Sequence, residues 1–297
     1  MRITVLFIFF FSILNVRGQS TNEPSVFPFP MEEQALLWKI EGKGLSKPSY
    51  LFGTMHLIEK TYFFFPEKLR KQVEKSEQLV LELPGIPSQQ EALKYIQLKE
   101  GSFFDFFAPL QVDSILLWAK SELRMNEAQF RGVMTKMKPF VAVQLATQMH
   151  FFGKTESYEM TLEKLAKEHQ LEIKGLETVE EQLNLFDGLS REEQTEMVME
   201  VVRKPSEQYT ETFTLEKLYQ RQQVDSLYLM IVDSEGTIAS ENTRFIDDRN
   251  ARWIPMIETY MTEKRSFIAV GAGHLGGPNG LIRLLQKRGY QLTPVKL

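Results

Sequence analysis

Two matching segments, one near each end of the globular part of the chain, constrain the fold more than any other feature. Residues 50–56 and 267–274 each start with an apolar run suited to a buried strand, reach a glycine, and place a histidine three residues later. The chain has only four histidines. Glycine permits positive φ and close backbone approach in a tight turn after a strand, so each imidazole can be directed across the end of a sheet. The two rings could therefore meet at one metal ion or one substrate.

The composition is that of an ordinary globular protein. The chain has 297 residues, of which 43% are apolar and 25% charged, enough for one large domain or two small ones. It contains no cysteine, which excludes a disulfide framework and a thiolate nucleophile. Any metal ligands must then be imidazoles, carboxylates and other oxygen donors.

The first 18 residues predict a secretory signal peptide. Arg2 precedes an apolar run over residues 4–14, which is shorter than the roughly 20 residues that span a membrane. Val16 and Gly18 stand at the −3 and −1 positions and predict cleavage before Gln19. We therefore expect an exported protein, periplasmic or secreted, with an uncleaved membrane anchor as the alternative.

The charge does not favour binding to nucleic acid. Without residues 1–18 the chain keeps 33 basic and 39 acidic residues, a net charge of −6. A nucleic-acid-binding surface is normally marked by an excess of Lys and Arg. We expect no nucleic-acid partner.

The order of the predicted elements indicates an α/β fold. A Pro-rich linker over residues 19–33 precedes one predicted domain over residues 34–297. We expect a central mixed, largely parallel sheet flanked by helices, with a helical insertion between the two Gly-x-x-His halves, placed between the strands that end near Gly175 and Val270. Thr178 and Glu181 have the spacing of a helix N-cap and its capping box. The predicted strands cover residues 36–40, 49–52, 78–83, 171–176, 265–270 and 290–295, and the predicted helical stretches cover residues 66–76, 89–169, 177–182, 192–263 and 280–288.

Four side chains suited to metal binding or proton transfer fall at or just after the ends of predicted strands. They are His56, Glu82, Glu177 and His274. Ligands bind at the carboxyl edge of open α/β sheets, where strand ends and helix N-termini converge. Two imidazoles with one or two carboxylates suit Zn, Mn, Co or Fe, and a spare carboxylate could act as a general base. Each residue also has a structural interpretation: a histidine that caps a turn, a solvent-facing strand end for Glu82, and an acid favoured at a helix start for Glu177.

Other candidates lie near these four. Arg249 and Asn250 begin a predicted helix, where they are either an exposed helix start or a clamp for an anion or carbonyl. Gly53, Gly271 and Gly273 are candidates for backbone contacts to a substrate. If residues 63–65, three phenylalanines, are exposed beside the first histidine, they form an apolar lip for a substrate. The glycines lack the sequence context of a phosphate loop or a dinucleotide fingerprint, so we expect no nucleotide, and no Gly-x-Ser-x-Gly motif indicates a serine hydrolase.

Six segments, taken in order, resemble the TraB/GumN family. This family is related to the Tiki membrane-tethered metalloproteases and, more distantly, to erythromycin esterase-like and haem-binding ChaN-like proteins. The resemblance implies an α/β fold whose active site contains two Gly-x-x-His motifs and acidic residues, and for Tiki-like members it implies Mn- or Co-dependent peptide cleavage. The segments are residues 37–40, 51–56, 79–82, 175–182, 249–250 and 270–281.

By this resemblance, His56 and His274 are metal ligands and Glu82 is a ligand or the general base. Glu177 is a further ligand or a supporting acid. Arg249 and Asn250 match the family's Arg-Asn pair, which would orient a substrate or ligand. Mn or Co is favoured as the metal, with Zn or Fe possible. The chain departs from the family pattern at residues 84–85, Pro-Gly directly after the predicted strand end.

Two functions of different classes follow from these observations. The first is an exported metal-dependent hydrolase that cleaves peptide bonds in a peptide or protein substrate. The second is a binding protein that sequesters a peptide signal or a metal-containing ligand without turnover. A structural domain of the cell envelope is a third interpretation, which leaves the paired motifs without a purpose. The sequence indicates neither the substrate nor the oligomeric state.

Overall fold

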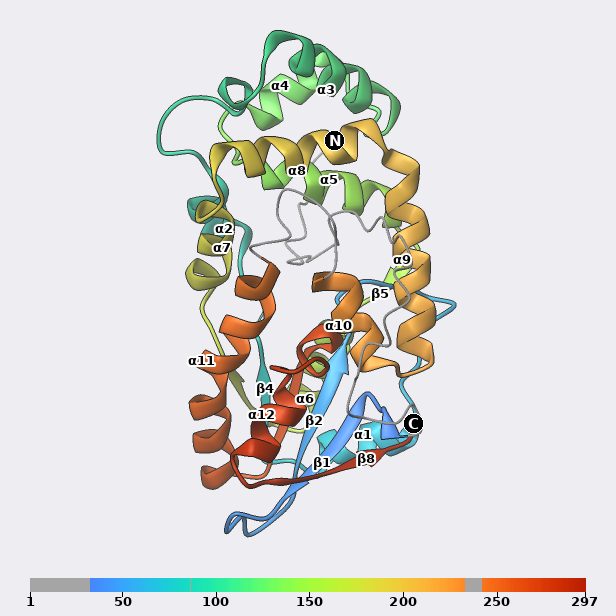
Figure 1. Ribbon diagram of the computed structural model, residues 1–297, viewed down its shortest axis with the longest axis vertical. Helices are drawn as coiled ribbons and strands as arrows, with labels where there is room; N and C mark the ends of the chain where they lie inside the picture. The colour runs from blue at the N-terminus through green and yellow to red at the C-terminus, as the bar shows by residue number, and fades with distance from the viewer. Residues whose placement is uncertain (1–32, 86, 233–241) are drawn as a thin grey trace.

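The computed structural model describes residues 33–85, 87–232 and 242–297 (Figure 1). The predicted signal peptide and all but the last residue of the predicted linker lie outside the described residues. Within the described ranges, no helix combines the length and apolar character needed to cross a membrane.

A mixed six-stranded sheet confirms the predicted α/β fold. Its strand order is β6-β4-β7-β2-β1-β8. The four strands β6, β4, β7 and β2 run parallel, whereas β1 is antiparallel to both of its neighbours, β2 and β8. A second sheet pairs β3 with β5. The strands are β1 (Leu37–Glu41), β2 (Ser49–Thr54), β3 (Ile58–Glu59), β4 (Gln78–Leu81), β5 (Thr155–Glu156), β6 (Glu172–Gly175), β7 (Ser266–Gly271) and β8 (Gln291–Val295).

The local sequence explains the strands that position the site. Strands β1 and β2 form the predicted hairpin, and its turn uses positive φ at three consecutive residues, Gly42, Lys43 and Gly44. Every residue of β2 and of β4 is buried. Continuous apolar runs are typical of parallel strands that are covered on both faces. The carboxyl ends of β2, β7, β4 and β6 therefore lie side by side at one edge.

Helices form two layers with separate hydrophobic cores. One core surrounds the sheet and includes Trp38, Phe52 and Phe267. The other lies among helices α2 to α5, α7 and α8 and includes Phe103 and Phe130. In Figure 1 the helical layer lies above the sheet, and α9 runs between the two layers. The helices are α1 (Glu67–Glu74), α2 (Gln89–Ile96), α3 (Pro109–Ser121), α4 (Glu127–Met134), α5 (Phe140–Phe151), α6 (Tyr158–Glu168), α7 (Val179–Asp187), α8 (Arg191–Arg203), α9 (Pro205–Gln220), α10 (Val224–Val232), α11 (Asn242–Glu263) and α12 (Leu281–Lys287).

The helical insertion is split in two, which differs from the predicted placement. Helices α2 to α5 leave the sheet after β4, and α7 and α8 leave it after β6, yet both groups contribute to one core. The predicted insertion covered only the second group. Helical periodicity marks each amphipathic segment but not which layer its apolar face packs against. The predicted helical stretch over residues 89–169 is also interrupted by β5, whose two residues are too short to give a strand pattern.

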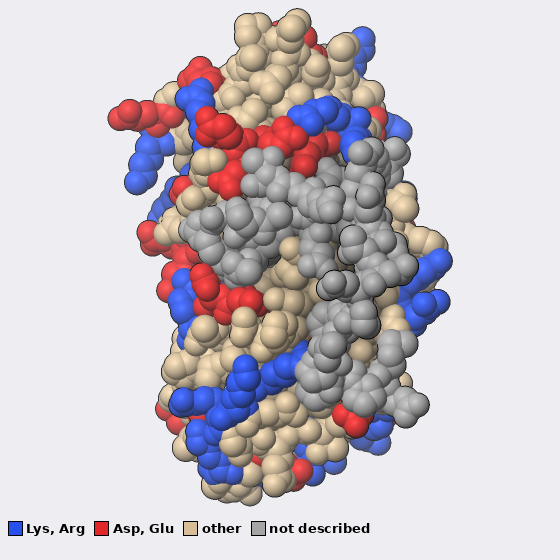
Figure 2. Space-filling model, viewed as in Figure 1, with Lys and Arg blue, Asp and Glu red and all other residues tan. Residues whose placement is uncertain are grey.

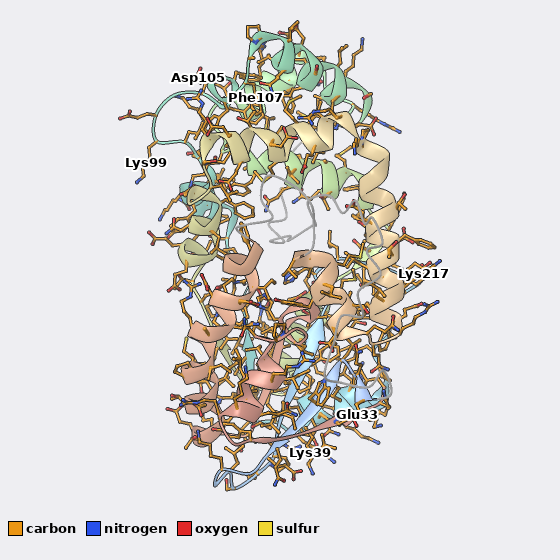
Figure 3. All side chains as sticks on the ribbon, viewed as in Figure 1. Glu33, Lys39, Lys99, Asp105, Phe107 and Lys217 are labelled. Atoms are coloured by element: carbon orange, nitrogen blue, oxygen red, sulfur yellow. The ribbon has the colours of Figure 1, made fainter. Side chains whose placement is uncertain are left out.

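Charge is unevenly distributed over the face seen in Figure 2. Carboxylates gather across the upper part of this face, at the level of α8 in Figure 1, and Lys and Arg form a band lower down, over α12. Figure 3 shows Asp105 and Phe107 in the helical layer and Lys39 in the sheet layer, with Lys217 on the outer side of α9. Several of the basic groups are paired, as Lys43 and Arg288 are with Glu258.

Gly175 allows the chain to pass closely at the end of β6. A Cβ added there would lie 2.5 Å from Cδ of Pro84, in the Pro-Gly pair that departs from the family pattern. We predict that Gly175→Ala destabilises the fold by about 1–3 kcal/mol, because neither β6 nor the proline ring can move freely. Chemical denaturation measures this.

Gly132→Ala is the matched control, because Gly132 lies inside α4 and a Cβ there would meet nothing within 4 Å. It should stabilise the protein by about 0.5–1 kcal/mol through helix propensity. Equal effects of the two substitutions would contradict the close packing at Gly175.

Candidate active site

The parallel strands bring the four predicted strand-end residues to one place. Glu82 follows β4 directly and Glu177 follows β6 by two residues. His56 follows β2 by two residues, and His274 ends the 3₁₀ turn after β7. Glu82, Glu177 and His274 are buried, whereas the His56 side chain is 21% exposed. Their juxtaposition is as predicted, and their chemical roles stay predictions.

Arg249 lies between the two carboxylates and is fully buried. Its Nη2 donates to Glu82 Oε2 and to Glu177 Oε1, each at 2.6 Å. Its Nε donates to Glu177 Oε2 at 3.1 Å and its Nη1 to the Phe245 carbonyl at 3.1 Å. We call Glu82, Glu177 and Arg249 the carboxylate–guanidinium cluster. Arg249 is therefore not an exposed helix start, because it lies inside α11 and contacts both carboxylates; its proposed role towards a ligand stays a prediction.

Asn250 fixes the orientation of His274. Its Nδ2 donates to the carbonyls of His274 (3.2 Å) and Asn279 (2.9 Å), so its Oδ1 is the acceptor that faces His274 Nδ1 at 2.7 Å. His274 Nδ1 must then carry the proton, and Nε2 keeps its lone pair. Nε2 accepts from Arg249 Nη1 at 3.0 Å. Trp253, one helical turn after Arg249, packs against the His274 ring with 4.6 Å between centroids.

A carboxylate that the sequence analysis missed orients His56 in the same way. His56 Nδ1 donates to Glu159 Oε1 at 2.9 Å, and Thr54 Oγ1 donates to the same oxygen at 2.6 Å. Glu159 lies in the first turn of α6, and Ser157 Oγ donates to its other oxygen. Glu159 lies far along the chain from both histidine motifs, so the sequence did not indicate this contact.

Both imidazoles direct Nε2 towards one carboxylate oxygen. Glu82 Oε1 lies 3.9 Å from His56 Nε2 and 3.9 Å from His274 Nε2. The Gly271 amide donates to the same oxygen at 2.8 Å. A Cβ on Gly271 would lie 3.4 Å from Glu82 Oε1 and 3.8 Å from His56 Nε2. Because Gly271 has no side chain, there is space where Glu82 Oε1 and the two imidazole rings converge.

The donor set fits a divalent ion, but the donor atoms lie farther apart than the ligands of one ion. Two nitrogens and one carboxylate oxygen suit Mn, Co, Zn or Fe. Two ligands about 2.1 Å from a tetrahedral ion lie about 3.4 Å apart, so the 3.9 Å separations would have to shorten. Arg249 Nη1 would also have to leave His274 Nε2. In the part of the chain that the structure describes, no group of three or more His, Asp or Glu side chains is arranged to hold a metal as it stands.

Burial and neighbouring charges shift the pKa values of the four titratable groups in different directions. Burial, followed by the Arg249 guanidinium, lowers the pKa of His274 to about 3. Burial opposes protonation of His56, but the Glu159 and Glu82 carboxylates outweigh it and raise the pKa of His56 to about 9. Burial likewise opposes ionisation of Glu82, yet Arg249 holds the pKa of Glu82 well below its usual range. Burial raises the pKa of Glu177 despite its contact with Arg249. Glu82 is therefore the permanent anion and Glu177 the carboxyl closer to accepting a proton.

Gln182 is a second residue that the sequence analysis did not assign to the site. It lies in α7, whose predicted capping box of Thr178 and Glu181 is confirmed. Its Nε2 donates to Glu177 Oε1 at 2.8 Å and to Glu82 Oε2 at 3.3 Å. Its position in the first part of the helix that follows Glu177 is a sequence signal that could have identified it.

The glycines of the two motifs act through close packing rather than positive φ. Neither Gly53 nor Gly271 is among the positive-φ residues, so of the two reasons given for these glycines the positive φ was wrong and the close backbone approach holds. A Cβ on Gly53 would lie 3.0 Å from Ala272, and one on Gly273 would lie 2.3 Å from Ile231 Cδ1. The backbone groups of Gly53 bond to Leu36 and Tyr219.

The remaining candidates are the three phenylalanines of residues 63–65 and the two other histidines. Residues 63–65 are half-buried, and all three rings pack near Tyr158. His169 ends α6 with its side chain 42% exposed. The side chain of His150 lies outside the described residues.

Comparison with known protein families matches most of the chain. The model of the TraB/PrgY/gumN family matches residues 36–294. No curated protein and no solved structure matches the chain.

The raised pKa of His56 predicts a loss of stability at alkaline pH. Its folded pKa of about 9 exceeds the unfolded value of 6.5, so the stabilisation is complete below pH 6.5 and is lost as pH rises through 9. Without metal, we expect the wild type to lose about 2–3 kcal/mol between pH 6.5 and 9 relative to His56→Gln. Urea denaturation in chelator measures the difference.

His169→Gln, at the exposed histidine, is the control and should keep the wild-type pH profile. Parallel profiles for the wild type and His56→Gln would contradict the pairing of His56 with Glu159.

The carboxylate–guanidinium cluster predicts a large cost for removing its cation. Arg249→Met leaves two buried carboxylates without their counter-ion, so we expect a loss of about 3–5 kcal/mol in the free energy of unfolding. The control is Arg203→Met, which removes an exposed ion pair with Glu196 and should cost less than about 1 kcal/mol. Similar losses in the two variants, measured by denaturation at pH 7, would contradict a buried ionic cluster.

Proposed function

Because the chain belongs to the TraB/PrgY/gumN family, we propose that it is an exported, divalent-metal-dependent hydrolase that cleaves peptide bonds. The observation that carries the proposal is the common direction of two imidazoles. Each has its Nδ1 held by an oxygen, from Glu159 or Asn250, and each directs Nε2 towards Glu82 Oε1. Histidines that bind metals typically donate their other ring N–H to such an oxygen.

His56, His274 and Glu82 would hold the ion. Mn or Co is the favoured metal, and Zn or Fe also suits two nitrogens and a carboxylate. The bound ion would lower the pKa of a water and polarise a carbonyl. The space beside Gly271 is bordered by groups of all three ligands.

The residues around the proposed metal ligands would control the charge, the proton transfer and the histidine tautomer at the site. Arg249 keeps Glu82 ionised through Oε2 and leaves Oε1 directed at the histidines. Glu177, with its raised pKa, is the carboxyl suited to take up and return a proton during peptide cleavage. Asn250 keeps His274 in the tautomer whose Nε2 can bind a metal. Gln182 links Glu177 to Glu82 through one amide group.

The proposed location is the periplasm or the extracellular space. It rests on the predicted signal peptide, and the absence of cysteine is compatible with an oxidising compartment. The proposed partner is a peptide or protein substrate.

One observation favours the second candidate, a binding protein without turnover. In this arrangement the charged groups satisfy one another, because Arg249 contacts both carboxylates and His274 Nε2. A site whose groups are already paired can bind a ligand at its rim without the open coordination position that hydrolysis needs. The ligand would be a peptide signal or a metal-containing compound.

The proposal predicts that the protein binds a metal ion and that this binding requires the two histidines. The purified protein, reconstituted with Mn or Co and freed of excess metal, should hold about one ion per chain by elemental mass spectrometry. The His56→Ala, His274→Ala double variant should hold none, and His169→Ala should bind as the wild type does. The loaded wild type should cleave members of a peptide library, whereas Glu82→Gln should not.

Unchanged metal content in the double variant would contradict the site. Metal or ligand that stays bound while every peptide remains intact after long incubation would favour the binding protein.

A further inference from the structure

A second buried ion pair lies beneath the segment that carries His274. Asp225, near the start of α10, is 2% exposed, and Arg283 of α12 is 8% exposed. Arg283 Nη1 donates to Asp225 Oδ1 at 2.9 Å and Nη2 to Oδ2 at 3.1 Å, a bidentate pair. Neither residue belongs to the carboxylate–guanidinium cluster, and neither was singled out from the sequence.

The pair holds both backbone polar groups of one residue in that segment, Gly277. The Gly277 amide donates to Asp225 Oδ1 at 2.8 Å, and Arg283 Nη1 also donates to the Gly277 carbonyl. Gly277 has a φ of +80° and follows His274 by three residues. We call residues 271–280 the His274 turn. We propose that Asp225 and Arg283 are positioning residues that hold this turn so that His274 Nε2 faces Glu82.

Helix α10 supports the turn through unusually close packing. A Cβ on Gly276 would lie 2.2 Å from the Val224 carbonyl oxygen, and a Cβ on Gly277 would lie 2.4 Å from the Tyr228 ring. The turn therefore rests directly on the backbone of α10 at the residue before Asp225. This contact leaves the turn little room to shift without breaking the hydrogen bonds to the pair.

Asn250 holds the turn from the opposite helix. Its Nδ2 bonds to the carbonyls of His274 and Asn279, which lie on either side of Gly277. The ion pair fixes the turn at Gly277, and Asn250 fixes it at His274 and Asn279, on either side. If Gly277 is released, the two carbonyls can move apart, and Asn250 cannot follow both and keep its Oδ1 opposite His274 Nδ1. The tautomer of His274 thus depends on the pair.

A purely stabilising role makes a different prediction from a positioning role. A buried ion pair can often be replaced by apolar side chains of similar volume with equal or greater stability. Such a replacement restores packing between α10 and α12, but it cannot bind the Gly277 amide and carbonyl. The double variant Asp225→Leu, Arg283→Met separates the two roles.

The first readout is the imidazole spectrum of the full chain. With four histidines, long-range ¹H–¹⁵N correlations can be assigned through His→Gln variants. We expect the metal-free wild type to show His274 as the single Nδ1-protonated tautomer. The double variant, with a denaturation midpoint near that of the wild type, should show His274 in a mixture of tautomers. The second readout is Mn²⁺ affinity, which should fall by about tenfold or more.

Arg283→Lys keeps the charge but replaces the two nitrogens that together bond both Asp225 oxygens and the Gly277 carbonyl by one, and it gives the decisive result if the double variant does not fold. Arg288→Gln, an exposed change at the end of the same helix, should leave both readouts unchanged. A folded Arg283→Lys or double variant with the wild-type His274 spectrum would overturn the proposal. The affinity readout rests on the proposed function; if the wild type binds no Mn²⁺, that function fails alone and the spectrum still decides the positioning role.

Discussion

The pairing of Arg249 with two buried carboxylates is the interaction on which the site depends. Two carboxylates that each lie 2.6 Å from one guanidinium nitrogen would repel each other strongly in a buried environment without that cation. Arg249 comes from α11, Glu82 from the end of β4 and Glu177 from the end of β6, so the cluster also joins a helix to two strands. The same guanidinium contacts His274, and burial together with this cation lowers the pKa of that imidazole and keeps it neutral. Charge balance and architecture are thus set by one side chain.

The parallel sheet explains why residues from distant parts of the chain meet. Four neighbouring strands end at one edge, and each contributes a polar residue within three positions of its end. Each of the two histidines is then oriented by an element outside those strands: Glu159 of α6 holds His56, and Asn250 of α11 holds His274. The strands bring the functional groups together, and the helices decide which atom of each group faces the centre. This division explains how the two Gly-x-x-His motifs are alike in sequence while their partners differ.

The sequence predicted the elements that depend on local pattern. The hairpin, the strand-end placement of His56 and His274 and the capping box of Thr178 follow from short-range periodicity and spacing. It did not predict Glu159 or Asp225, because their partners lie far away in the chain and neither residue has a local motif. For Gly53, the expected close backbone approach is present as packing against Ala272, whereas the expected positive φ is not. Such contacts are decided by tertiary packing, and no local pattern in a single sequence reveals that packing.

The central claim is that His56, His274 and Glu82 form a single metal-binding centre. Its most direct test is anomalous diffraction from crystals of the protein grown with Mn²⁺. The account predicts one strong anomalous peak about 2.1–2.2 Å from both Nε2 atoms and from Glu82 Oε1, with Arg249 Nη1 moved off His274. A map without a peak there, in which Arg249 still donates to His274 Nε2 at saturating Mn²⁺, would contradict it.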